Sequence, residues 1–190
     1  IACLTDLDPV QGKQNKSCPP IFQAEPDNKN PNIESIKALK SANIKVFSQD
    51  EDSDYKSNEG WTFEYQLYMD NPDLMPLIFH DSMRYCDAWE NLKKMSIENL
   101  SIEKISNTFQ NERSKQIDGI LKENHNANDL SEITDSKLIK LYIGTMFLYS
   151  IKDKGLYAQE LSEEISSGKS ITVPKYIKKC FKWMADKNGL

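Results

Sequence analysis

The sequence predicts an α/β protein, in which a Rossmann-like parallel sheet portion is followed by an α-helical portion. The chain opens with the apolar run Ile1-Ala2-Cys3-Leu4, and a second apolar run, residues 44–47, follows a stretch with helical periodicity. A strand, a helix and a second strand in this order are typical of a parallel strand pair with a helical crossover. From Thr62 onward the apolar residues recur at helical spacing, which predicts helices for the remainder.

The first apolar run ends in Asp6, Asp8 and Pro9. Its continuous apolar character is typical of a parallel strand buried on both faces, and proline cannot extend the hydrogen-bond ladder. Residues two apart in a strand point to the same side, so the two aspartates can converge. Ligands of open α/β sheets bind beyond the carboxyl ends of strands, and paired carboxylates there favour Mg²⁺ or Mn²⁺. This pattern predicts a divalent-metal site.

The segments after the aspartates alternate between polar loops and short regular elements. Residues 9–31 are polar and aperiodic, which predicts a loop beside the site. A helix is predicted at residues 32–42, a strand at 44–47, and an acidic surface loop at 49–60. The apolar stripe of that helix consists of Ile33, Ile36 and Leu39.

Helices are predicted through most of the remaining chain. Thr62 opens a helix that Pro72 closes, and Pro174 occupies a helix N-terminal position where proline is favoured. The other predicted helices span residues 77–95, 98–110, 112–124, 135–152, 156–166 and 175–186. The predicted apolar face of helix 135–152 contains Leu138, Leu141, Tyr142, Thr145 and Leu148. That of helix 156–166 contains Ala158, Leu161 and Ile165, and that of helix 175–186 contains Tyr176, Ile177, Cys180, Phe181 and Met184. Trp61, Trp89 and Trp183 are expected in the core.

Composition indicates an ordinary globular chain of 190 residues, with 38% hydrophobic and 28% charged residues. No apolar run approaches the length of a membrane span, so no membrane partner is predicted. The four cysteines are widely spaced without a CxxC motif, which favours free thiols and a cytoplasmic location. His80 and His125 form no ligand cluster and are expected at the surface.

The formal net charge of −5 gives no general support for nucleic-acid binding, although a local groove would still allow it. Four lysines form a stripe on the last predicted helix. Such a stripe is usually a solvated face, but it is also suited to contacting a DNA backbone. These residues are Lys175, Lys178, Lys179 and Lys182.

The start of the sequence predicts a fragment of a longer protein. It has no initiator Met, and the first predicted strand begins at residue 1. A secretory signal would show a basic segment and a longer apolar stretch. Part of the sheet, and with it part of the site, is therefore expected upstream.

An apolar strand followed by two aspartates has several interpretations. One is a plain strand end with turn-forming residues. A second is a haloacid-dehalogenase-type phosphatase with Asp6 as the nucleophile, since residues 6–10 match its DxDx[TV] pattern. That chemistry also needs a later acidic pair after an apolar strand, which the sequence lacks, so the phosphatase remains a distant alternative.

Three further segments, in addition to the aspartate pair, resemble the overcoming-lysogenization-defect (OLD) family of ATP-dependent endonucleases. WTFEYQL at residues 61–67 resembles the family's TLEYxLA segment, and KGLYAQEL at residues 154–161 resembles KGxFAxxLA. VPKYIKK at residues 173–179 is similar to the terminal vPxYIxxA helix. Order and approximate spacing agree over almost the full chain, and this implies the C-terminal Toprim portion of such a nuclease.

The resemblance implies a site and a division of the chain. Asp6, Asp8 and Glu64 would be metal ligands for two Mg²⁺ or Mn²⁺ ions, and Lys154 would face the scissile phosphate. Residues 1–72 would be the C-terminal part of a Toprim core, and residues 73–190 the helical portion that completes the nuclease region. From the residues alone, Glu64 is equally a helix-start glutamate and Lys154 a solvated lysine.

The implied activity is metal-dependent hydrolysis of DNA phosphodiester bonds in anti-phage defence. The implied partners are DNA, an upstream ATPase region that alone would bind ATP, further copies of the chain in a dimer or larger oligomer, and accessory defence proteins or nucleic acid. The chain departs from the family pattern because it lacks the upstream Toprim glutamate and any GxxxxGK[ST] motif, and because Tyr157 replaces the usual Phe. A non-catalytic assembly or DNA-binding module derived from Toprim is therefore kept as an alternative.

Overall fold

The computed structural model describes six segments of the chain: residues 1–5, 31–39, 43–49, 62–72, 77–96 and 99–189. The chain divides into two compact units. Unit 1 comprises Ile1–Asp70 and Thr172–Leu190, and unit 2 comprises Asn71–Ile171. The predicted division at residue 72 placed the last helix with the helical portion, whereas in the structure this helix packs on the strands.

Unit 1 is built on a parallel strand pair, as predicted. Strand β1 (Ala2–Leu4) pairs with β2 (Lys45–Phe47) in a register that places Cys3 opposite Val46. Helix α1 (Pro31–Ala38) lies between the two strands in sequence. The pairing continues past β1, because the Thr5 amide donates to the Phe47 carbonyl oxygen at 3.1 Å.

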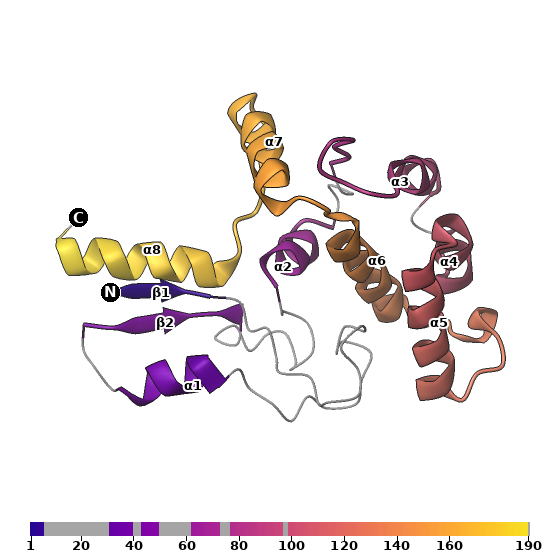
Figure 1. Ribbon diagram of the computed structural model, residues 1–190, viewed down its shortest axis with the longest axis horizontal. Coiled ribbons are helices and arrows are strands. Elements are labelled where there is room, and N and C mark those ends of the chain that lie inside the picture. The colour runs from indigo at the N-terminus through magenta and orange to yellow at the C-terminus, as the bar shows by residue number, and fades with distance from the viewer. Residues whose placement is uncertain (6–30, 40–42, 50–61, 73–76, 97–98, 190) are drawn as a thin grey trace. The chain divides into compact units, whose positions relative to one another are not determined.

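Helices cover both faces of this sheet. Helix α8 (Lys175–Asn188) packs against both strands and α1 packs against β2, and Figure 1 shows the two helices on opposite sides of the sheet. The Trp183 ring lies 6.0 Å from the Phe47 ring, measured between centroids. This burial stabilises a strand pair that is too small to persist in water alone.

Two predictions for unit 1 are wrong in detail. The first helix ends at Ala38 rather than at residue 42, and Leu39 is 63% exposed instead of continuing the apolar stripe. Strand β1 is not buried on both faces, because Leu4 is 49% exposed. The predicted loops at residues 9–31 and 49–60 fall almost entirely outside the described residues, but Gln49 is buried rather than at the surface.

Helix α2 (Phe63–Asp70) completes unit 1 and begins where the sequence predicts. The Thr62 side chain accepts a hydrogen bond from the Tyr65 amide at 3.2 Å, which satisfies a donor that the first helical turn leaves open. Residues 64–68 are all buried. A helix buried around this much of its circumference belongs to an interior, not to a surface.

Unit 2 consists of short helices with well-formed N-terminal caps. Side chains of Ser101, Asn111, Asp135 and Asp153 each accept a backbone amide of the helix that follows. The helices are α3 (Cys86–Lys93), α4 (Ile102–Phe109), α5 (Glu112–His125), the 3₁₀ helix η5 (Leu130–Glu132), α6 (Ser136–Ser150) and α7 (Lys154–Ser166).

The core of unit 2 is centred on Trp89, which is fully buried as predicted. Its ring makes edge-to-face contacts with Phe109 and Phe147, at centroid distances of 4.9 and 6.5 Å. The indole nitrogen donates to the Ser150 hydroxyl at 2.8 Å, so the polar atom is satisfied inside the core. Trp89 therefore joins α3, α4 and α6.

The predicted helix at residues 77–95 is wrong over its first half, because α3 begins only at Cys86. The preceding residues instead pair with the segment after α6: Met83 forms an antiparallel bridge with Ile151, and the Arg84 amide donates to the Ser150 carbonyl oxygen. This pairing uses backbone groups that a helix would have used internally. The long-range contact therefore overrides the local periodicity.

Several predicted core positions are at the surface. Phe181 is 63% and Ile165 is 40% exposed, and Ala158 is also exposed. By contrast, Leu141, Tyr142 and Thr145 of α6 are buried as predicted. The helical period located these elements but did not identify every residue on their buried faces.

The described segments are mostly helical with a two-stranded parallel sheet, and none of their helices is long and apolar enough to cross a membrane. Cys3, Cys86 and Cys180 are free thiols, as predicted, and both histidines are exposed.

A polar network joins α4, α5 and α6 within unit 2. The Asp118 carboxylate accepts hydrogen bonds from the Ser106 hydroxyl at 2.5 Å and from the Tyr142 hydroxyl at 2.8 Å. Burial raises the pKa of the Asp118 carboxyl above its ordinary value, although these two hydrogen bonds and Lys122 oppose the shift. Burial, together with the Asp118 charge, also raises the pKa of Tyr142.

The stability of unit 2 should depend on the charge of Asp118. A carboxyl with a raised pKa in the folded state contributes stability that is fully present below its unfolded pKa and is lost as the pH rises through the folded pKa. We expect Asp118→Asn, which keeps an oxygen acceptor and adds a donor, to gain stability relative to the wild type as the pH rises from acid towards neutral. Asp118→Leu, which leaves the Tyr142 and Ser106 hydroxyls without this partner, should cost about 1–3 kcal/mol at every pH. Urea denaturation across this pH range measures both, and equal pH dependence of wild type and Asp118→Asn would contradict the account.

Candidate functional site

The candidate site lies at the carboxyl ends of β1 and β2, which meet at one edge because the strands are parallel. The hydrogen bond between the Thr5 amide and the Phe47 carbonyl oxygen holds the chain in the sheet up to the residue before Asp6. Asp6 and Asp8 themselves lie outside the described residues. The structure therefore fixes the strand that leads to the predicted aspartates, and their contacts remain a prediction.

The carboxyl end of β2 supplies two buried polar residues. Continuing the register places Ser48 opposite Thr5, and Ser48 is fully buried. Among the described residues its hydroxyl has no hydrogen-bond partner. Gln49 is 6% exposed, and its side-chain amide donates to the Tyr176 hydroxyl of α8 at 3.4 Å. Buried polar groups at this place are the groups that ligand sites of open α/β sheets use.

Glu64 lies in the first turn of α2, in the same unit as the strands. It is 7% exposed, which is rare for a glutamate. The positive end of the helix dipole favours a carboxylate here. Its burial distinguishes Glu64 from an ordinary surface glutamate at a helix start.

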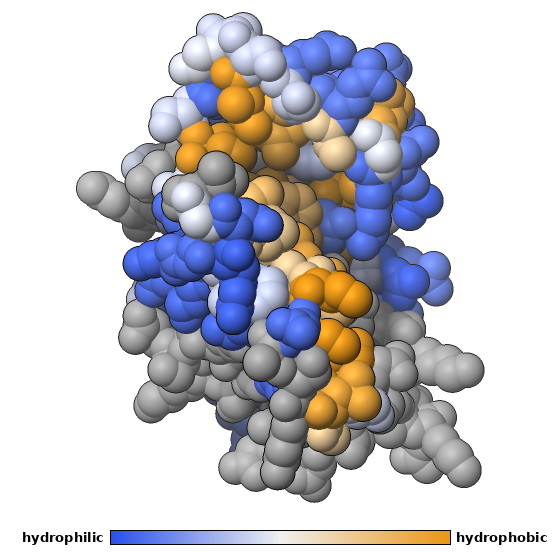
Figure 2. All heavy atoms as spheres, turned by 90° about the vertical axis from the view of Figure 1, so that its left-hand side faces the viewer, coloured by the Kyte–Doolittle hydropathy of each residue, from blue (hydrophilic) through white to orange (hydrophobic). Residues whose placement is uncertain are grey.

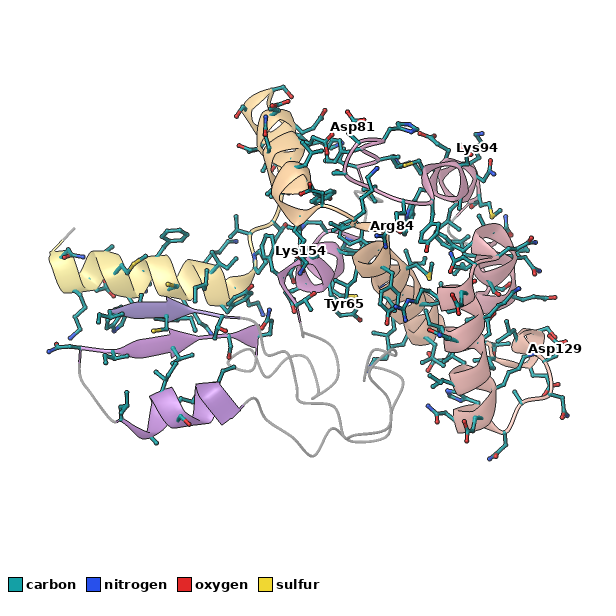
Figure 3. All side chains as sticks on the ribbon, in the orientation of Figure 1. Tyr65, Asp81, Arg84, Lys94, Asp129 and Lys154 are labelled. Carbon is teal, nitrogen blue, oxygen red and sulfur yellow. The ribbon has the colours of Figure 1, made fainter. Side chains whose placement is uncertain are left out.

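Lys154 is the first residue of α7 and is exposed; it is labelled in Figure 3. The preceding Asp153 caps the helix by accepting the Leu156 amide at 3.0 Å. The helix dipole disfavours a positive charge in the first turn, so the position does not stabilise the charged lysine. The backbone before Lys154 is also held by a second contact. The Lys152 amide donates to the Ser82 carbonyl oxygen at 2.9 Å.

The predicted site residues are divided between the two units. Glu64 and the strand that leads to Asp6 and Asp8 belong to unit 1, whereas Lys154 belongs to unit 2. No cluster of three or more histidine, cysteine or acidic side chains suited to a metal occurs within the segments that the structure describes. Of the three predicted metal ligands, Glu64 lies within the described residues, and Asp6 and Asp8 lie outside them.

Ser48, Gln49 and Tyr176 were not predicted from the sequence. The signal for the first two was the one used for the aspartates: polar residues directly after an apolar strand, here the SQ that follows IKVF. Tyr176 could not be assigned in this way, because its approach to Gln49 depends on α8 returning to the sheet from 127 residues away.

Two of the cysteines have a raised thiol pKa. Burial raises the pKa of the Cys86 and Cys180 thiols, and for Cys180 a contribution from Cys3 acts in the same direction. A raised pKa lowers the fraction of reactive thiolate at neutral pH.

Comparisons of the chain with protein-family models, with curated proteins and with solved structures find no match. The chain combines a helix-covered parallel strand pair with a compact unit of short helices.

The buried Ser48 hydroxyl has a matched control in unit 2. Ser82 is also fully buried, with a hydroxyl that has no partner among the described residues. A buried hydroxyl without a partner costs about 1–3 kcal/mol, so we expect both Ser48→Ala and Ser82→Ala to keep or raise the free energy of unfolding. Chemical denaturation without added metal measures this. A loss of stability in Ser48→Ala alone would contradict the expectation and show that this hydroxyl is hydrogen-bonded.

Proposed function

We propose that this chain is the C-terminal Toprim portion of an OLD-type, ATPase-coupled endonuclease that hydrolyses DNA in anti-phage defence. The observation that supports the proposal most is the parallel pair β1–β2, which ends at Thr5, directly before Asp6. Acidic residues at this edge of a parallel sheet are suited to a divalent cation. The OLD-like segments at residues 61–67, 154–161 and 173–179 give the proposal its particular class.

The donor set fits Mg²⁺ or Mn²⁺. Asp6, Asp8 and Glu64 offer carboxylate oxygens, which these hard cations prefer. Glu64 is buried in unit 1, which is rare for a glutamate and supports a role beyond solubility. Two bound ions would activate water and stabilise the leaving oxygen of phosphodiester cleavage.

The protein's own residues then divide the work of binding and charge stabilisation. Asp6 and Asp8 would hold the cations at the strand end, and Glu64 would add a third carboxylate from α2. Lys154 offsets the negative charge that develops on the phosphate in the transition state. Its exposed place at the start of α7 leaves the side chain accessible to a large substrate.

The first test removes the carboxylate charges while keeping side-chain size. Asp6→Asn with Asp8→Asn should abolish Mn²⁺ binding measured by calorimetry and lower Mn²⁺-dependent cleavage of plasmid DNA on the order of a hundredfold or more. The protein with its upstream region should be used, because the resemblance places a further ligand there. Cleavage at the wild-type rate in the double variant would refute the nuclease proposal, and Mn²⁺ binding without cleavage would favour a non-catalytic module.

The second test separates Lys154 from the metal ligands. Lys154→Met should lower the cleavage rate by about 10²–10³-fold, as expected for the loss of one transition-state donor, and leave Mn²⁺ affinity unchanged. Lys94→Met is the matched control, because Lys94 is an exposed lysine that follows α3 in the same unit. Equal rates for the two variants would remove Lys154 from the mechanism.

A further inference from the structure

The outer face of α8, defined as Lys175, Lys178, Lys179, Phe181 and Lys182, combines positive charge with an exposed aromatic ring. All five residues are exposed, and Phe181 is 63% exposed. The opposite side of the helix carries the buried Tyr176 and Cys180 and packs on the strands, so the orientation of α8 is fixed. The outer face is therefore a defined surface of unit 1.

Positive charge is concentrated in this helix although the whole chain is acidic. Helix α8 has five lysines and one aspartate in 14 residues, in a chain with a formal net charge of −5. Asp186 follows Lys182 by one turn, so the positive charge is greatest over the first two turns. Figure 2 looks at the side of unit 1 where α8 ends, and hydrophobic residues there lie among hydrophilic ones.

The spacing along the helix places the ring at one edge of the lysine stripe. Lys178 and Lys182 are four residues apart and therefore lie one above the other on the helix surface. Phe181 follows Lys178 by three residues and is its neighbour on the helix surface, whereas Lys182 lies about 100° further round the helix. An aromatic ring beside ammonium groups within about one helical turn is the combination that binds bases and phosphates of a single strand together.

Charge and shape distinguish this surface from other binding surfaces. Protein interfaces are depleted in lysine, so a face with four lysines and one phenylalanine does not favour a protein partner. One aromatic side chain is too little apolar surface to hold a helix in a membrane interface. In a DNA duplex the base faces are stacked inside, where Phe181 has no access to them, whereas an unpaired base exposes its face to the ring.

We propose that the outer face of α8 binds single-stranded nucleic acid, with Phe181 stacking on a base and Lys178 and Lys182 contacting the flanking phosphates. The inference deepens the proposed function, on which it rests for the class of partner, because it specifies an unpaired strand. It requires no metal and no contribution from Asp6 or Asp8.

The test is fluorescence anisotropy with a labelled single-stranded DNA of about 20 mixed nucleotides, in EDTA and over a range of salt concentrations. We expect Phe181→Ala to weaken binding about tenfold and Phe181→Tyr to retain it, because tyrosine also stacks. Lys178→Gln with Lys182→Gln should make the slope of log affinity against log salt less negative by about 1.4, since each phosphate contact with a single strand contributes about 0.7.

The controls separate this surface from general charge and from the metal site. Lys93→Gln with Lys94→Gln removes two exposed lysines of unit 2 and should leave binding unchanged. The binding assay contains EDTA and therefore does not depend on a bound cation, so failure of the nuclease proposal is distinguishable from failure of this one. Since Phe181 is exposed, its truncation should leave the thermal unfolding curve unchanged.

Three results would overturn the inference. The first is unchanged affinity in both the Phe181→Ala and the lysine variant. The second is tighter binding to the duplex of the same sequence than to the single strand. The third is binding to anionic phospholipid vesicles in the absence of measurable binding to the oligonucleotide.

Discussion

The fold of unit 1 depends on the need to cover a very short parallel strand pair. Two strands of three residues each cannot form a stable sheet in water, and parallel strands are buried on both faces in known folds. Helix α1 covers one face from between the strands, and α8 covers the other from the end of the chain. The sheet of unit 1 is therefore covered in part by a helix that is far from it in the sequence, through contacts such as Trp183 with Phe47.

This closure links the candidate site to the surface of α8. The side of α8 that faces the sheet contributes Tyr176 to the carboxyl end of β2, through its hydrogen bond with Gln49. The other side presents Phe181 and the lysines to solvent. One helix thus supports the edge where Asp6 follows β1 and also carries the surface proposed for single-stranded nucleic acid.

The sequence predicted the elements better than their burial. Apolar runs and helical period located the parallel strands, α2 and most of the helical residues of unit 2, because these signals are local. They failed where contacts are distant: Met83 pairs with Ile151 in place of helix, and Phe181 faces solvent because the sheet contacts the other side of α8. At the site, the aspartates and Glu64 followed from position and resemblance, whereas Tyr176 near Gln49 could not be predicted without the return of α8.

The central claim is that a divalent cation binds where β1 and β2 end. The most direct measurement is paramagnetic relaxation by Mn²⁺ in amide NMR spectra of the protein, compared with a diamagnetic Mg²⁺ sample. We expect broadening of the Thr5, Ser48 and Glu64 amides that is stronger than the broadening of Ala2 and Lys45, which pair at the opposite ends of the strands. Broadening that is absent from Thr5 and Ser48, or that is strongest in unit 2, would contradict it.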